Sequence, residues 1–250
     1  MKLSIIIPVF NEEKTVEAIL KKIEKVKLED FEKEVIVVDD GSTDTSVSVI
    51  SNLKSQISNL KFVLHKKNLG KGAAVRTGLK QAIGDYVIIQ DADLEYDPGE
   101  YKKILVPVLK WNADVVFGSR VLGPEMVRVH YLWNQIGNRA LTWFFNLLYN
   151  KTFTDVYTCY FLYKRSLVNL RHLKTVGFEQ QAEIICHCLR QTRSIYEVPI
   201  SYFGRTIEEG KKIKARHAFS CFKTVFLQRF FPPKSREKEE SPLLSPYPRS

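Results

Sequence analysis

Short apolar runs alternate with helical patterns along the chain. Four mainly apolar runs predict strands, at residues 3–9, 34–38, 86–89 and 113–118. The run at 86–89 is apolar without alternation, which is typical of a strand buried on both faces of a sheet. Between the first two runs, apolar residues recur at helical spacing from Val16 onwards. This order of strand, helix, strand and helix with short links predicts an α/β fold with a mostly parallel, doubly wound sheet.

Further strands are expected at residues 62–64, 156–163 and 195–200. The last should lie at an edge of the sheet, because Pro199 cannot donate to a ladder of hydrogen bonds. Proline also weakens helices, so the helix expected near residues 101–110 should kink or stop early at its internal proline.

The remaining helices carry two kinds of signal. Asn11 and Asp44 have side chains suited to capping, and each is expected to cap the helix that follows it. Residues 131–149 are helical in pattern and rich in aromatic side chains. That helix either packs thickly against the core or also lines a lipid groove.

Acidic residues follow the most apolar strand. Residues 86–89 run directly into Asp91 and Asp93, with Glu95 two residues later. Ligands of open α/β sheets bind outside the carboxyl ends of the strands, and oxygen ligands suit Mg²⁺ or Mn²⁺ on a diphosphate. The alternative is a solvated acidic turn before Pro98.

Polar residues also follow neighbouring strands, at 10–12 and 39–42, which places three polar loops on one rim of the sheet and favours a ligand site. Arg120 follows the strand at 113–118. Its planar guanidinium is suited to holding phosphate, and the alternative is a surface salt bridge.

The charge of the chain is concentrated near its end. Of 250 residues, 38 are Lys or Arg and 28 are Asp or Glu, so the net charge is 38 − 28 = +10. Residues 204–229 hold seven Lys or Arg against two Glu, which favours a localised anionic partner. No nucleic-acid-binding motif is recognised, so we do not expect a nucleic acid as that partner.

Within this basic region, residues 214–231 combine an apolar face with flanking cations. Such a segment is typical of an amphipathic helix on an anionic membrane surface, and the alternative is a helix packed on the domain. The sequence has no run of 18 apolar residues, so no transmembrane helix is expected. Four cysteines do not form a disulfide framework, which favours a cytoplasmic setting. Residues 232–250 hold five of the ten prolines and are expected to be a disordered tail.

Four motifs, taken together, resemble family 2 glycosyltransferases with the GT-A fold. They lie in the order and spacing of that family, at residues 5–12, 37–42, 70–78 and 91–93. Later segments resemble the dolichol-phosphate mannose synthase-like branch, at residues 118–120, 137–139, 154–160, 197–202 and 205–212. The resemblance implies a Rossmann-like, mostly parallel sheet flanked by helices, within one glycosyltransferase domain at 1–231.

The resemblance also implies residue roles. Nucleotide-binding positions would be Pro8, Phe10, Glu12 and Asp40, with Lys71 near the phosphates. Metal ligands for Mg²⁺ or Mn²⁺ would be Asp91, Asp93 and Glu95, although several relatives have Gln at the third position. The acceptor phosphate would be held by Arg120, Arg139, Arg205 and Lys212, with Arg128 or His130 replacing an arginine that the acceptor loop lacks.

The implied reaction is transfer of mannose or glucose from GDP-mannose or UDP-glucose to a polyprenyl or dolichyl phosphate, with inversion. Asp93 would act through the metal on the leaving diphosphate, and Arg120 would orient the acceptor. If the acceptor is instead a soluble, glycan or protein hydroxyl, a base is needed, and Asp155 or Glu179 are candidates. The competing hypothesis is a non-catalytic protein that binds a nucleotide-sugar. The enzyme is expected to lie on the cytoplasmic face of a membrane. Either residues 214–231 or a partner protein would anchor it there.

Overall fold

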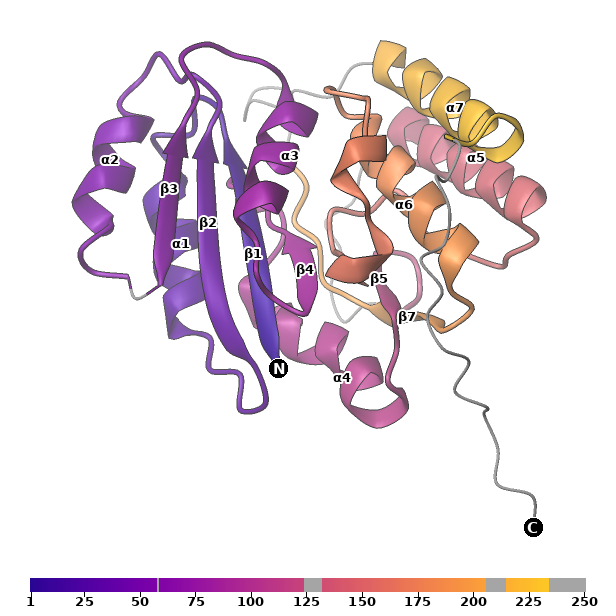
Figure 1. The fold of residues 1–250 in the computed structure, drawn as a ribbon, viewed down its shortest axis with the longest axis horizontal. Helices are drawn as coiled ribbons and strands as arrows, with labels where there is room; N and C mark the ends of the chain where they lie inside the picture. The colour runs from indigo at the N-terminus through magenta and orange to yellow at the C-terminus, as the bar shows by residue number, and fades with distance from the viewer. Residues whose placement is uncertain (58, 124–131, 206–214, 234–250) are drawn as a thin grey trace.

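The computed structural model describes residues 1–57, 59–123, 132–205 and 215–233. A sheet of seven strands runs through the molecule in the order β3-β2-β1-β4-β6-β5-β7 (Figure 1). The strands are β1 (Lys2–Val9), β2 (Glu32–Asp39), β3 (Leu60–Leu64), β4 (Tyr86–Ile89), β5 (Val115–Ser119), β6 (Phe161–Lys164) and β7 (Ile195–Pro199). All neighbouring pairs are parallel except those of β6, which runs antiparallel to β4 and β5. The predicted mostly parallel α/β fold is therefore confirmed.

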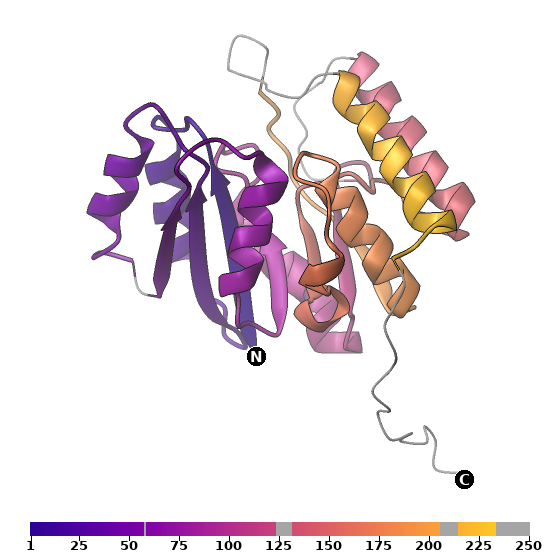
Figure 2. The ribbon, with the colours of Figure 1, turned by 45° about the horizontal axis from the view of Figure 1, so that its top comes forward.

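Helices cover both faces of this sheet. They are α1 (Val16–Lys25), α2 (Ser46–Leu53), α3 (Lys71–Gln81), α4 (Tyr101–Trp111), α5 (Leu132–Tyr149), α6 (Gln180–Gln191) and α7 (Ala215–Phe230). In Figure 1, α3 lies in front of β1 and β2, and α1 lies behind β2 and β3. Figure 2 shows α5 and α7 side by side at the other end of the molecule, with α6 beneath them.

The core is built from the apolar runs of the central strands. Ile5, Ile6 and Ile7 of β1 are fully buried, because β1 has strands on both sides and helices on both faces. In the parallel register, Val9 lies beside Asp39, and Ile6 lies beside Ile89. The polar residues that follow β1, β2 and β4 therefore reach the same edge of the sheet.

The structure corrects two expectations about where helices begin and end. Helix α4 continues through Pro107 to Trp111, because its buried side chains hold it against the sheet despite the lost hydrogen bond, whose cost is about 3 kcal/mol. Helix α1 begins only at Val16, and Asn11 does not cap it. Asn11 has a φ of 53°, and its side chain accepts a hydrogen bond from Thr43 N instead, which joins two loops.

Other expectations hold in part. Strand β7 lies at the edge of the sheet, as Pro199 indicated. Of the strand expected at 156–163, only residues 161–163 are in a strand, β6, because 156–160 form a loop at the rim of the sheet. Asp44 accepts a hydrogen bond from Ser46 N in the first turn of α2, although it precedes the capping position. All four cysteines are free and buried, and residues 234–250 of the expected tail lie outside the described residues.

Helix α3 packs closely on β1 because Gly78 has no side chain. An added Cβ at this position would overlap Ile6 Cγ2 of the fully buried strand. Gly78→Ala should therefore lower the free energy of unfolding by about 1–3 kcal/mol, because the overpacked pair must shift. Urea denaturation followed by circular dichroism measures this change.

The matched control is Gly137→Ala on α5, where an added Cβ meets no atom of the described residues within 4 Å. It should be neutral, or stabilising by up to about 1 kcal/mol, because alanine favours the helix. A Gly78→Ala protein as stable as the Gly137→Ala protein would contradict the proposed close contact.

Candidate functional site

A cavity of about 560 Å³ opens at the carboxyl edge of the parallel strands. The loops after β1, β2 and β4 and the start of α3 form one side of it, and residues from α5, α6 and α7 complete it. Ten of the residues singled out in the sequence line it: Pro8, Phe10, Glu12, Asp40, Lys71, Asp91, Asp93, Glu95, Arg120 and Arg205. Segments as distant in sequence as Pro8 and Arg205 thus share one cavity.

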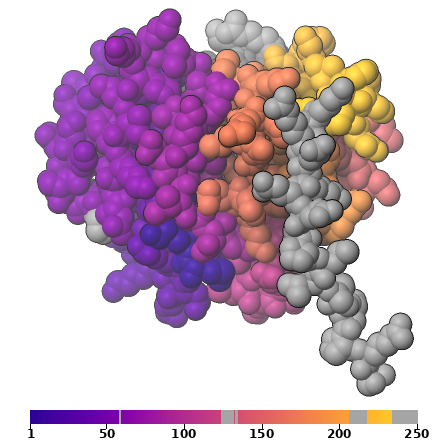
Figure 3. Space-filling view, in the orientation of Figure 1, coloured from indigo at the N-terminus to yellow at the C-terminus, as the bar shows by residue number. Residues whose placement is uncertain are grey.

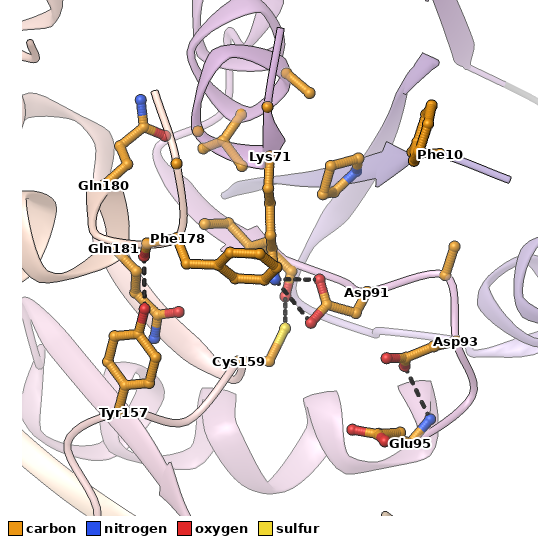
Figure 4. A pocket seen from close by; sticks show the side chains of 18 of the residues that line it. Phe10, Lys71, Asp91, Asp93, Glu95, Tyr157, Cys159, Phe178, Gln180 and Gln181 are labelled. Carbon is orange, nitrogen blue, oxygen red and sulfur yellow. Dashed lines mark hydrogen bonds and ion pairs between the residues drawn. The ribbon is translucent and has the colours of Figure 1, made fainter. Parts of the chain in front are cut away.

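Lys71, the first residue of α3, points into this cavity (Figure 4). Its Nζ lies 2.6 Å from Oδ1 and 2.8 Å from Oδ2 of Asp91, and 5.6 Å from the centre of the Phe178 ring. Burial alone would lower the pKa of Lys71, but Asp91 outweighs it, so the pKa lies above its ordinary value. A charged ammonium therefore sits on one of the predicted metal ligands.

Asp93 follows on the same turn. Its Oδ1 accepts a hydrogen bond from Glu95 N at 3.1 Å, and Leu94 between them has a φ of 65°, which is uncommon for a residue with a side chain. Burial, and after it the charges of Asp91 and Glu95, raise the pKa of Asp93 to about 7. The turn thus holds a carboxylate where its negative charge is unfavourable, and a bound cation would offset that cost.

Glu95 has a different environment. Its Oε2 accepts a hydrogen bond from Tyr202 OH at 2.7 Å, and its Oε1 accepts one from Arg205 N at 2.7 Å. Both carboxylate oxygens thus fix the segment after β7. In the described part of the chain, no three Asp, Glu, His or Cys side chains converge closely enough to hold a metal ion. Oxygen ligands and the ammonium already bound to Asp91 nevertheless fit a cation at Asp91 and Asp93.

Arg120 lies at the end of β5 and is bound by Asp155. The guanidinium Nε is 2.7 Å from Oδ2 and Nη2 is 2.8 Å from Oδ1, a two-pronged ion pair, and both side chains are largely buried. The ring of Tyr202 lies 5.0 Å from the guanidinium carbon. Asp155 does not line the cavity itself; it fixes the guanidinium of Arg120, which does.

Arg205 joins two rims of the cavity. Its Nη2 lies 3.1 Å from Glu12 Oε2, and its Nε donates to the backbone carbonyl of Asp93 at 2.9 Å. The loop after β1 is thereby tied to the turn after β4. Of the other cations predicted to hold the acceptor phosphate, Arg139 is exposed on α5 outside the cavity lining, and Lys212 lies outside the described residues, as do Arg128 and His130.

The glycine-rich stretch before α3 serves close packing. Asp40, which directly follows β2, accepts hydrogen bonds from Leu69 N and Gly70 N and so attaches this loop to the end of that strand. A Cβ at Gly72 would lie 2.7 Å from Gly177 O, so only glycine lets the loop around 176–177 approach. Ala73 N donates to the carbonyl of Val176 in the same seam.

Gln90 forms the floor beneath the carboxylates and is fully buried. Its Oε1 accepts hydrogen bonds from Tyr101 OH and Tyr160 OH, both at 2.6 Å. Its Nε2 donates to the backbone carbonyl of Asp91 at 2.9 Å. The amide therefore connects the start of α4 and the loop before β6 to the turn that carries the acids.

The sequence motifs did not predict the side of the cavity formed by the loop before α6 and by α6 and α7. Glu183, which is buried, accepts hydrogen bonds from the backbone N–H groups of Lys174 and Thr175 and so braces the loop in front of α6. Glu179, a candidate base, accepts from Gly177 N and is not a lining residue. The lining residues missed by the motifs include Phe178, Gln180, Gln181 and Cys221. Apolar periodicity could place them on a loop or helix but could not indicate which face meets the cavity.

Comparisons with known proteins bear on this site. The sequence profile of the family described as "Glycosyl transferase family 2" matches residues 4–170. A dolichol-phosphate mannosyltransferase of Pyrococcus furiosus is 26% identical over 228 residues, covering 90% of this chain but only 63% of that protein's length. A UDP-N-acetylglucosamine–dolichyl-phosphate N-acetylglucosaminyltransferase of Methanococcus voltae is 26% identical over 213 residues, 78% of this chain and 83% of that protein.

Solved structures share the fold. Glucosyl-3-phosphoglycerate synthase of Mycobacterium tuberculosis, in complex with Mn²⁺, uridine diphosphate and phosphoglyceric acid, matches with a TM-score of 0.66 at 20% identity. The match covers 94% of this chain and 80% of that one. At this identity the likeness shows a common fold.

The raised pKa of Asp93 predicts a cost in stability. The folded protein binds this proton more tightly than the unfolded chain, since the pKa rises from 3.8 to about 7. Without divalent metal, the free energy of unfolding should therefore fall as the pH rises between these values. Asp93→Asn should be more stable than the wild type by about 1–3 kcal/mol near pH about 8, and equally stable at or below pH about 4.

Urea denaturation across this pH range tests the expectation. Asp30→Asn, at an exposed position, is the matched control and should leave the pH dependence unchanged. If Asp93→Asn were less stable than the wild type near pH about 8, the carboxylate would not be held at a cost in the free protein.

Proposed function

The chain belongs to glycosyl transferase family 2, and we propose that it transfers a hexose from a nucleotide-diphosphate sugar to a polyprenyl phosphate on the cytoplasmic face of a membrane. The observation that carries this proposal is the single cavity. It brings acids and cations suited to a metal and phosphates together with residues of α5 and α7, namely Gly137, Asn138, Leu141, Ala218 and Cys221. The two curated relatives named above bear dolichol-phosphate and dolichyl-phosphate in their names.

The donor would bind between the ends of the parallel strands. Pro8, Phe10, Glu12 and Asp40 line this side of the cavity, so they are the residues we assign to the base and ribose. Lys71 would take one of the phosphates, because its ammonium is already directed into the cavity. The solved relative that holds uridine diphosphate and Mn²⁺ has the same fold, which supports a nucleotide and a divalent ion as ligands of this chain.

Asp91 and Asp93 are the residues we assign to Mg²⁺ or Mn²⁺. A bound ion of this kind would act as a Lewis acid on the diphosphate that leaves. Glu95 was expected as a third ligand. Because both of its oxygens accept hydrogen bonds from the segment after β7, we assign it the positioning of Tyr202 and Arg205.

The acceptor phosphate would meet Arg120 and Arg205. A phosphate monoester has a second pKa of about 6, so at neutral pH it is largely a dianion and needs no strong base. Attack by its oxygen on the sugar's C1, opposite the leaving diphosphate, inverts the configuration at that carbon. Arg120 is held rigidly by Asp155, so the chain's own contribution here is to orient the nucleophile.

Two neighbouring helices supply a surface for the lipid. On α5, Leu132, Trp143 and Leu147 are exposed, and Trp143 is 65% exposed. On α7, Phe219 is 73% exposed and Phe226 46%, and α7 lies on the outside of the molecule (Figure 3). No helix in the described ranges has the length and apolar character needed to cross a bilayer. We therefore propose that an apolar surface lying in the headgroup region brings the cavity to its acceptor.

Transfer to a soluble acceptor is the alternative, and the solved relative holds phosphoglyceric acid, a soluble compound. A hydroxyl acceptor needs a base. Asp155 is engaged by Arg120, and Glu179 is not among the lining residues, so neither candidate is placed for that role in this conformation.

The reaction can be tested directly with radiolabelled donors. GDP-mannose and UDP-glucose should each be supplied with Mn²⁺ and either a polyprenyl phosphate or phosphoglyceric acid. We expect product with the polyprenyl phosphate. Asp93→Asn should lower that rate at least about a hundredfold, because the leaving diphosphate loses electrostatic stabilisation.

Asp30→Asn is the control and should keep the wild-type rate. Product formed only with phosphoglyceric acid would replace the lipid acceptor by the soluble one. Binding of a donor with no product from either acceptor would indicate a non-catalytic nucleotide-sugar-binding protein.

The membrane surface makes a separate prediction. The double variant Phe219→Ser and Phe226→Ser should bind anionic vesicles at least about tenfold more weakly, since burying each phenylalanine is worth roughly 1.5–3 kcal/mol. Co-sedimentation with vesicles measures this affinity. The matched double variant Val106→Ser and Leu109→Ser removes exposed apolar side chains from α4 and should bind like the wild type. Equal losses in both doubles would argue against a specific surface on α7.

A further inference from the structure

Each of three cations lining the cavity is paired with a carboxylate. Arg120 pairs with Asp155 and Arg205 with Glu12. Neither of those carboxylates is expected to bind the metal. Lys71 differs, because its carboxylate is Asp91, one of the two residues assigned above to the divalent ion. The ammonium of Lys71 and the divalent ion would therefore compete for the carboxylate of Asp91.

The ion pair between Lys71 and Asp91 is close on both oxygens. Nζ lies 2.6 Å from Oδ1 and 2.8 Å from Oδ2, so it engages the whole carboxylate. About a quarter of each side chain is exposed, which leaves the pair only partly screened by water. A divalent ion that arrives at Asp91 must take at least one of these oxygens from the ammonium.

Besides Asp91, two uncharged groups lie close to the ammonium of Lys71. Figure 4 shows Lys71 between Asp91, the ring of Phe178 and the sulfur of Cys159. Burial raises the pKa of the Cys159 thiol well above its usual value, so this neighbour is neutral. An ammonium displaced from Asp91 therefore loses both of its close carboxylate contacts and keeps an aromatic ring and an uncharged thiol beside it. The other carboxylate whose charge favours this ammonium, Asp93, is itself assigned to the ion.

A diphosphate changes this balance. When it lies in the cavity, Lys71 has an anionic partner, and the carboxylate of Asp91 is released for the ion. Asp91 and Asp93 would hold the ion, which would supply positive charge to both carboxylates and to the phosphates. The diphosphate would thus free Asp91 for the ion, and the ion would reduce the repulsion between the carboxylates and the phosphates. Binding of either ligand would therefore strengthen binding of the other, which is a favourable coupling between two sites.

We propose that Lys71 is the resident counter-ion of Asp91, and that its exchange from Asp91 to the diphosphate makes metal binding depend on nucleotide binding. This inference rests on the proposed function for the identity of the nucleotide. It assigns Lys71 a positioning role, because the residue acts on the metal through Asp91 and not as a metal ligand.

Binding of Mn²⁺ followed by electron paramagnetic resonance tests this directly, since free Mn²⁺ gives a signal that bound Mn²⁺ loses. The wild type should bind Mn²⁺ weakly alone, and about 5–150-fold more tightly with saturating uridine or guanosine diphosphate. Lys71→Met removes the competing cation but keeps the length of the side chain. It should bind Mn²⁺ roughly tenfold more tightly without nucleotide, while the gain on adding the diphosphate shrinks.

By reciprocity, the diphosphate should bind the wild type more tightly with Mn²⁺ than without it, by the same factor. Titration calorimetry measures this second affinity. Lys66→Met is the matched control: it removes a lysine from the exposed loop before α3 and should keep wild-type affinities and coupling. Lys71→Arg retains a cation and should keep most of the coupling.

Two results would overturn the inference. One is a Lys71→Met protein, folded by circular dichroism, whose Mn²⁺ affinity without nucleotide is unchanged or weaker. The other is a wild type whose Mn²⁺ affinity is the same with and without the diphosphate, which decides the matter even if Lys71→Met does not fold. The proposed function is judged separately, by product formation. Transfer without coupling would remove only the counter-ion role, and coupling without transfer would remove only the enzymatic assignment.

Discussion

Opposite charges that come from distant parts of the chain meet at one edge of the sheet, and the site depends on their pairing. Lys71 and Asp91 are 20 residues apart, Arg120 and Asp155 are 35 apart, and Arg205 and Glu12 are 193 apart. A half-buried charge without a partner loses hydration that nothing replaces, so each pair favours the fold that brings its members together. The same pairs surround the cavity with charges already oriented, which is the arrangement that phosphate chemistry requires.

The sheet makes this pairing geometrically possible. Parallel register brings the ends of β1, β2 and β4 to one rim, and antiparallel β6 brings the loop at 156–160 back to it. Glycines at 72 and 78 let α3 lie against the loop at 176–177 and against β1, so that its first residue, Lys71, faces the cavity. Fold and site are therefore fixed by the same contacts.

Much of this was predictable from local pattern, and the rest depended on partners far away in sequence. A buried strand followed by acids is a local signal, and it located Asp91 and Asp93 on the lining. Glu95 carries the same signal, but its Oε2 accepts a hydrogen bond from Tyr202, 107 residues later, a contact that no local pattern reveals. The predictions from Asn11 and Pro107 failed for the same reason. The contact of Asn11 with Thr43 outweighed its preference for capping a helix, and the burial of α4 outweighed the preference of Pro107 for ending one.

The buried amide of Gln90 links residues outside the cavity to the turn that carries Asp91 and Asp93. Gln90 receives two tyrosine hydroxyls on one oxygen and passes a hydrogen bond to the carbonyl of Asp91. Tyr101, in the first turn of α4, is therefore connected through Gln90 to the turn that carries Asp91, although it does not line the cavity. A substitution at Tyr101 that leaves the fold intact would thus still change the support of the Asp91 turn from outside the cavity.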